Sequence, residues 1–238
     1  MRISEVVRTV TRIIVPLLVL GVMAVEASAQ TNAQDEGTFE ILVNGRPAGT
    51  EEFTIRQTGV GSAAEFVATG RVQVLLPTGR LDLTTRLRAS GFQADPVTYE
   101  ATTVSSAPRR MIASIGGGRV SARTVTPSGE QLREYLASEG AVVLDEGVMH
   151  QYYFLVRRTR GGRVPVLIPR ENRQVMAQVT DLGESLVNIQ GVQVSLYQLS
   201  VQPDGGDERR VWTDALGRVI RVEIPALSYV AVRTELPR

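Results

Sequence analysis

Residues 145 to 158 read Asp-Glu-Gly-Val-Met-His-Gln-Tyr-Tyr-Phe-Leu-Val-Arg-Arg, and the predicted fold is built around this stretch. Asp145 is suited to cap a first helical turn, and Arg157 and Arg158 suit the negative C-terminal end of a helix. Apolar side chains recur at 3.6-residue spacing and share one broad face, which leaves His150 and Gln151 on the other: Val148, Met149, Tyr152, Tyr153, Leu155 and Val156. The pattern predicts one main helix, over about 146–158.

Segments on both sides of this helix alternate apolar with polar side chains, as strands with one buried face do. In residues 80–89, Leu81, Leu83 and Leu87 share one side, and arginines and Asp82 share the other. Turn sequences of the Asn-Gly and Gly-Gly type separate the segments at the spacing of a meander. We predict strands at 39–43, 52–56, 64–76, 80–89, 96–104, 109–115, 119–126, 130–136, 163–168, 173–180, 184–190, 192–201, 208–214, 218–224 and 229–236.

The predicted fold class is all-β with one main helix. No strand–helix–strand alternation and no Pro- or Ser-rich linker divides the chain, so residues 38–238 are predicted to form a single antiparallel β domain. A sheet of a dozen or more long strands tends to curl. We expect a large curved sheet, a half-barrel or β-roll, with the helix packed on its concave face.

The first 29 residues have the pattern of an export signal, with three arginines ahead of an apolar run over residues 13–25. Ala27-Ser28-Ala29 fits the small-residue cleavage pattern, which places the cut after Ala29. The apolar run is shorter than the ~20 residues of a membrane span, and an uncleaved anchor is the alternative. We expect a periplasmic or secreted mature protein with a disordered lead-in at 30–37 and no transmembrane segment.

Composition excludes several functions. Residues 30–238 carry as many acidic as basic residues, so nothing indicates a nucleic-acid partner. Cysteine is absent, which rules out disulfides, thiolate metal sites and a lipidated cysteine. The basic residues are all Arg apart from His150, and without Lys there is no Schiff base and no phosphate-loop lysine. We predict no metal site and no cofactor.

Four short motifs, taken in order, resemble a group of uncharacterised bacterial periplasmic proteins. They are Val43-Asn44-Gly45-Arg46-Pro47-Ala48-Gly49, Leu144-Asp145, the Tyr152-Tyr153 helix ending at Arg157, and Val211-Trp212-Thr213-Asp214 before Gly217-Arg218. The group is similar to the curved-sheet envelope proteins that include the lipoprotein carriers LolA and LolB. The resemblance implies an envelope location and a hydrophobic or lipid-like ligand between sheet and helix. It implies no catalytic residue.

Motifs for catalysis are weak. His150 is the only histidine, and lying off the apolar face it is expected to be a plain surface residue, with a catalytic role as the alternative. Asp204, Asp207 and Glu208 lack the spacing of a calcium loop, and Gly116–Gly118 lacks the helix and lysine of a phosphate loop. No serine lies in a Gly-x-Ser-x-Gly elbow.

Two groups of residues are candidate binding sites. Met149, Tyr152, Tyr153 and Trp212 are either ordinary core or the lining of an apolar pocket under the helix. Arg157 and Arg158 either complete the helix C-terminus or contact an anionic envelope component.

Three functions follow as hypotheses. The first is a non-enzymatic periplasmic protein that binds or carries an apolar or lipid-like ligand. The second is an envelope assembly protein that acts through protein–protein contacts at sheet edges or on its outer face. The third is a carbohydrate-active enzyme that uses paired carboxylates. A cavity between Tyr152 and Trp212 favours the first, and a filled interior with exposed apolar surface favours the second.

Overall fold

The computed structural model describes residues 32–76, 79–104 and 108–237. It contains one helix, α1 (Tyr152–Arg158), and three 3-10 turns at Gly61–Ala63, Pro169–Glu171 and Pro225–Leu227. Its strands are β1 (Asn32–Val43), β2 (Arg46–Thr58), β3 (Glu65–Leu76), β4 (Gly79–Ser90), β5 (Asp95–Thr103), β6 (Arg109–Gly116), β7 (Arg119–Thr126), β8 (Gly129–Leu136), β9 (Val142–Val143), β10 (Gly162–Ile168), β11 (Arg173–Ile189), β12 (Val192–Pro203), β13 (Arg209–Thr213), β14 (Val219–Ile224) and β15 (Tyr229–Arg233).

All the strands belong to one sheet, in the order β8-β7-β6-β5-β4-β3-β2-β1-β15-β14-β13-β12-β11-β10-β9. Strands that follow each other along the chain pair with each other, except that β8 and β9 lie at the two ends of the sheet. The one pairing between strands distant in the sequence is that of β1 with β15, which joins the two halves. Every described pairing is antiparallel apart from the short one between β9 and β10. The sheet therefore consists of two meanders, β1 to β8 and β9 to β15, which are joined where the first strand, β1, pairs with the last strand, β15.

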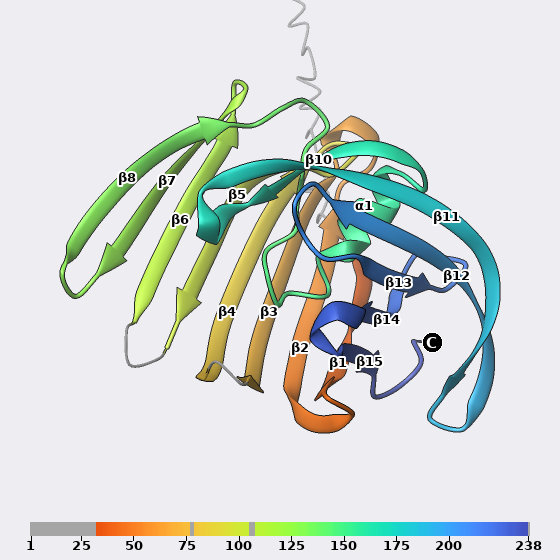
Figure 1. Ribbon diagram of the computed structural model, residues 1–238. Coiled ribbons are helices and arrows are strands. Elements are labelled where there is room, and N and C mark those ends of the chain that lie inside the picture. Colours follow the sequence, from red (N-terminus) through yellow and green to blue (C-terminus); the bar gives the residue numbers. More distant parts are fainter. Residues whose placement is uncertain (1–31, 77–78, 105–107, 238) are drawn as a thin grey trace, which may run out of the picture.

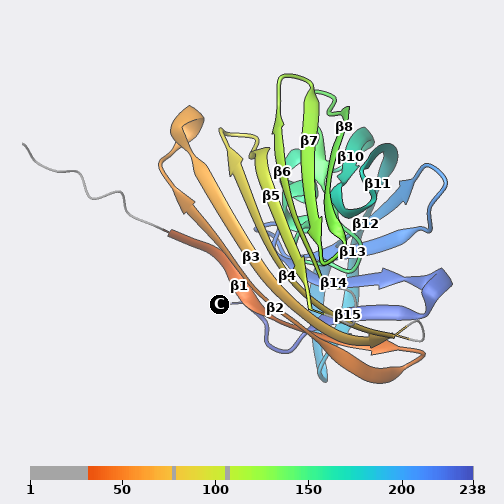
Figure 2. The same cartoon turned by 90° about the vertical axis from the view of Figure 1, so that its left-hand side faces the viewer.

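The sheet curves so that its two arms, β1 to β8 and β10 to β15, enclose α1 (Figure 1), and Figure 2 shows the same curvature from another side. The concave face is apolar: Phe66, Leu83 and Leu87 are buried there, while alternate residues such as Arg86 and Arg88 are exposed. The loop from 137 to 151 and α1 fill the space between the arms, with residues Tyr152–Val156 all buried. The prediction of a large curved antiparallel sheet with the helix on its concave face is confirmed.

Several boundaries differ from the predictions; β2 begins at Arg46 rather than at residue 52, and β9 was not predicted. The helix begins at Tyr152 rather than near 146, because Asp145 turns into the core instead of capping a helical turn. Residues 32–37, predicted as a disordered lead-in, belong to β1 and pair with β2. The strands predicted at 173–180 and 184–190 are one strand, β11, with a register shift between Asp181 and Gly183.

The predicted export signal, residues 1–29, lies outside the described residues. In the part of the chain that the structure describes, no helix is long and apolar enough to cross a membrane.

Candidate functional site

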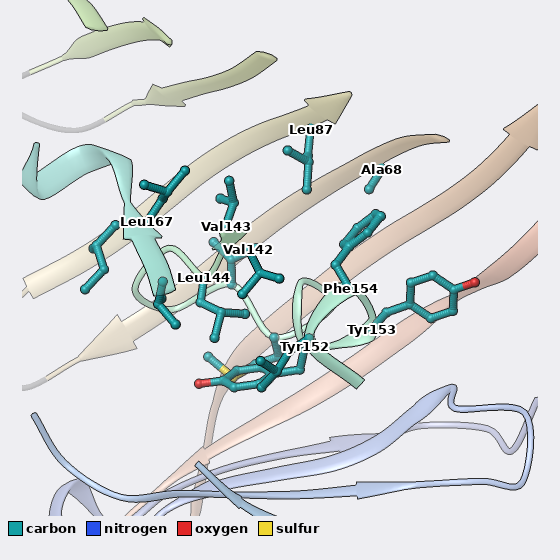
Figure 3. Close-up of a cluster of buried hydrophobic side chains, with 14 of the residues drawn as sticks. Ala68, Leu87, Val142, Val143, Leu144, Tyr152, Tyr153, Phe154 and Leu167 are labelled. Carbon is teal, nitrogen blue, oxygen red and sulfur yellow. The ribbon is translucent and has the colours of Figure 1, made fainter. Parts of the chain in front are cut away.

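The four predicted pocket residues do not meet. Met149, Tyr152 and Tyr153 are buried in the main core, between α1 and the concave face. In Figure 3, Phe154 points toward Ala68 and Leu87 on the sheet, while Tyr152 and Tyr153 leave the helix in other directions. Trp212 lies on the opposite face of the sheet, because its neighbour Val211 is the residue that faces the main core. The structure therefore places no cavity between Tyr152 and Trp212.

The space under α1 is filled by side chains. A cavity that touches Met149, Tyr152 and Leu144 has a volume of about 20 Å³, room for about one water molecule. Pockets for small ligands generally measure about 300–1,000 Å³. The side chains here pack as a core.

Arg157 and Arg158 are both engaged within the protein. The guanidinium of Arg157 lies over the Phe66 ring, 4.8 Å from its centroid, and donates to the Phe92 carbonyl. Arg158 donates to the Asp95 carboxylate at 2.5 Å. The two arginines therefore connect the C-terminal end of α1 to the loop between β4 and β5 and to the first residue of β5.

A fully buried Glu51–His150 pair holds the segment before α1 on the sheet. Glu51, on β2, accepts from the Met149 and His150 backbone N–H groups at 2.7 and 3.2 Å. Its Oε1 also lies 2.5 Å from His150 Nδ1. The prediction that His150 is a surface residue is wrong: its exposed fraction is 1%. Because the helix begins only at Tyr152, the 3.6-residue periodicity used to place His150 does not apply to it.

His150 lies directly over Gly70 of β3. A Cβ atom at Gly70 would lie 2.5 Å from His150 Cε1, so only glycine leaves room for the ring. Thr85, the neighbour of Gly70 on β4, has a buried hydroxyl near the ring. This Thr85 hydroxyl and His150 Nε2 have no hydrogen-bond partner among the described residues. Glu51, His150 and Thr85 bring a carboxylate, an imidazole and a hydroxyl together, but all three are sealed inside the core.

Asp145 anchors the other end of the same loop. It accepts from the Tyr99 hydroxyl at 2.7 Å and from Arg170 Nε at 2.5 Å. Burial raises the pKa of Asp145, although the Arg170 charge and the Tyr99 hydrogen bond act in the opposite direction. The pKa of Tyr99 is also raised well above its usual value, first by burial and second by the negative charge of Asp145. Gln151 joins the cluster, since its Oε1 accepts from the Asp145 backbone N–H at 2.6 Å.

A second buried ion pair joins the first and last strands. Arg233 of β15 donates to Asp35 of β1 at 2.5 Å and to the Val219 carbonyl at 2.7 Å. Its guanidinium lies over Phe53, 4.7 Å from the ring centroid, and His150 stacks on the same ring at 5.5 Å. Burial raises the pKa of Asp35, against the effect of Arg233.

Larger hollows lie on the surface of the molecule. One of about 330 Å³ is lined by Arg80, Arg109 and Arg170 together with four carboxylates, so its charge is mixed. Another, of about 630 Å³, lies beside the loop after β8, next to Ile115 and Arg158. Neither touches the four predicted pocket residues, although Arg158, a predicted anionic contact, lines the second hollow.

The two ends of the sheet differ. β9 is a buried two-residue strand, whereas β8 has eight residues and forms strand hydrogen bonds only with β7, although it also comes close to β11. Leu132 and Leu136 of β8 are 72% and 61% exposed. An open edge of this length offers backbone groups to another strand.

These features define a β-barrel-like domain made from one curved, open sheet. The sequence matches no family model and no curated protein. It is similar in structure to a β-barrel-like protein of domain of unknown function DUF1849 from Brucella abortus, known from a crystal structure. The TM-score is 0.55, the identity is 11%, and the match covers 85% of this chain and 96% of that chain. At this identity the likeness shows the fold alone.

Proposed function

We propose that this protein is exported to the cell envelope and acts without catalysis, through contacts of its outer sheet surface and edges with other proteins. The observation that carries the proposal is the filled interior: the space under α1 leaves a cavity of only about 20 Å³ at Met149 and Tyr152. A carrier needs an internal volume that its ligand can occupy. With the interior filled, binding is left to the outer surface.

The chain's buried polar groups support a non-enzymatic role. Glu51, Asp35 and Asp145 each bind a residue from a distant part of the sequence, and each is buried. A general acid or base must reach a substrate, directly or through one water molecule. These carboxylates hold the fold together instead.

Export is supported by the N-terminal sequence, with Arg2, Arg8 and Arg12 before the apolar run and Ala27-Ser28-Ala29 after it. Expression of the full chain in a Gram-negative host, followed by fractionation and intact mass measurement, tests this part. The expected product is a periplasmic protein that begins at Gln30. Uncleaved protein in the membrane fraction would favour the anchor alternative.

Site-specific photo-crosslinking in the periplasm tests the contact function. A photoreactive residue is placed at Leu132 on the β8 edge or at Thr84 on the convex face, with the buried Val143 as the control position. We expect crosslinked protein adducts from at least one outer position and none from Val143.

Native mass spectrometry with lipid extraction on the same preparation tests the carrier hypothesis. No adduct from either outer position would overturn the contact proposal, and a bound apolar molecule that is lost on Tyr152→Ala would support the carrier hypothesis in its place. A ligand-free protein with outer adducts is the expected result.

A further inference from the structure

The backbone of β8 has one row of hydrogen-bonding groups directed away from the sheet. The Ala137 N–H donates to the Gly118 carbonyl at 3.0 Å, which makes 118 and 137 a hydrogen-bonded pair in the β7–β8 ladder. Such pairs recur at every second residue of an antiparallel ladder. Odd-numbered residues of β8 therefore bond to β7, and the N–H and C=O groups of Glu130, Leu132, Glu134 and Leu136 face the open side.

The opposite end of the sheet is short, and the free part of β11 is interrupted. β9 has only two residues. The part of β11 beyond β10 contains a register shift at Asp181–Gly183, which twists an edge and hinders pairing. β8 has no such shift, since its eight pairs with β7 run without a break from Gly129 to Leu136, and it contains no proline.

The side chains of these four residues share the convex face and alternate acidic with apolar. Glu130 pairs with Arg123 at 2.6 Å, and Glu134 pairs with Arg119 at 3.3 Å, so both carboxylates lie on the face of those arginines. A strand added to the edge would place its own side chains directly opposite this row, at about 4.5–5.5 Å between Cβ atoms. Basic residues opposite the two Glu and apolar residues opposite the two Leu would complement it.

A second copy of β8 fits this edge poorly. Two copies of β8 related by a two-fold axis could pair edge to edge as antiparallel strands in two registers, and each register would pair seven residues of β8. The register centred on Leu132 places Glu130 opposite Glu134, and the register centred on Arg133 places that arginine opposite itself. Like charges directly opposite each other destabilise a strand pair. The favoured occupant is therefore a segment from another protein.

We propose that the β8 edge binds an extended segment of a partner protein that carries basic and apolar side chains alternately on one face. This inference rests on the proposed contact function and names the chemistry of its partner. The partner adds one strand to the sheet, with affinity from backbone hydrogen bonds and selectivity from the row of Glu130, Leu132, Glu134 and Leu136.

Peptide binding to the chain from Gln30 onward tests the proposal. The probe is Val-Thr-Arg-Thr-Val-Thr-Arg, which places Arg opposite both glutamates when it runs antiparallel to β8. One control replaces Arg with Glu, and another has the same composition in the order Val-Val-Arg-Arg-Thr-Thr-Thr. We expect both controls to bind about tenfold more weakly than the probe or worse.

Leu132→Pro provides a backbone test. The Leu132 N–H faces the open side, so proline removes an edge donor without breaking the β7–β8 ladder. The variant is expected to lose at least about tenfold in affinity, while Leu132→Thr, which keeps the N–H, loses less. In the wild type, binding should slow hydrogen exchange at the amides of Leu132 and Glu134.

Equal binding of the probe and its scrambled control, or binding with no added protection at Leu132 and Glu134, would overturn the inference. So would the absence of probe binding. Crosslinks from Thr84 with no peptide bound at β8 would reject this inference and leave the proposed contact function standing. No adducts from any outer position would reject the contact function itself.

Discussion

At the scale of single residues, the pairing of Gly70 with His150 shows how a small residue in a strand can set the position of a distant loop. Glycine in a strand often marks a close approach by another group, and here that group is an imidazole 80 residues further along the chain. The position of the His150 ring also depends on Glu51, whose carboxylate accepts hydrogen bonds from two backbone N–H groups and faces His150 Nδ1.

Gly70→Ala is expected to destabilise the protein by about 1–3 kcal/mol, because the added methyl group would overlap the His150 ring and force it to move. Gly116→Ala is the matched control, since a Cβ there meets no atom within 4 Å. Urea denaturation of both variants measures the difference. Equal stability of the two variants would show that the His150 ring can move away from the added methyl group at little cost.

Glu51→Gln is expected to lower the free energy of unfolding by about 1–3 kcal/mol. The NH2 group of the new amide would face backbone N–H groups of Met149 and His150, which are donors too. Its neighbour Glu52 is exposed, and Glu52→Gln should change the free energy of unfolding by no more than about 0.5 kcal/mol. A Glu51 variant as stable as the Glu52 variant would contradict the role of this carboxylate.

At the scale of elements, the β11–β12 hairpin builds a second core on the convex side. Ile189 and Leu196 of this hairpin pack with Trp212 and Ile220, and the Gln190 side chain donates to the Arg233 carbonyl at 3.4 Å. The end of the hairpin therefore reaches β15, three strands away in the sheet. Trp212 packs in this cluster rather than beside the helix.

Leu196→Ala is expected to cost about 2–5 kcal/mol, because Leu196 is 1% exposed in the second core. Leu186 lies in the same hairpin and is 76% exposed, so Leu186→Ala should stay within about 0.5 kcal/mol of the wild type. Trp212 fluorescence follows both variants, since it is the only tryptophan. A red-shifted emission in Leu196→Ala alone would fit the described packing, and a shift in both would not.

At the scale of the whole molecule, two buried aspartates make stability depend on pH. Burial raises the pKa of Asp35 and of Asp145 above the ordinary 3.8 in the folded state. Between 3.8 and the raised value, the folded protein keeps a proton that the unfolded chain has lost. The contribution of each group to stability therefore falls as the pH rises through that window.

The comparison of wild type with Asp145→Asn isolates this effect, because other titrating groups are common to both proteins. We expect the stability of the wild type relative to the variant to decrease as the pH rises from about 3.5, and then to level off. Urea denaturation at stepped pH values measures it. A relative stability that increases with pH would mean that the pairing with Arg170 outweighs burial.

Most strands of this protein follow from its amino-acid sequence, because the alternation of apolar and polar residues and the turn residues are local signals. The sequence also placed Leu81, Leu83 and Leu87 on a dry face and predicted the curved sheet. The sequence pattern did not indicate that β1 pairs with β15, that Trp212 faces away from the helix, or that Glu51 contacts His150. Each of these depends on contacts between residues far apart in the chain, where burial and charge pairing override local periodicity. The helix shows the same limit: seven residues are helical, and the preceding ones follow Glu51 and Arg170 instead.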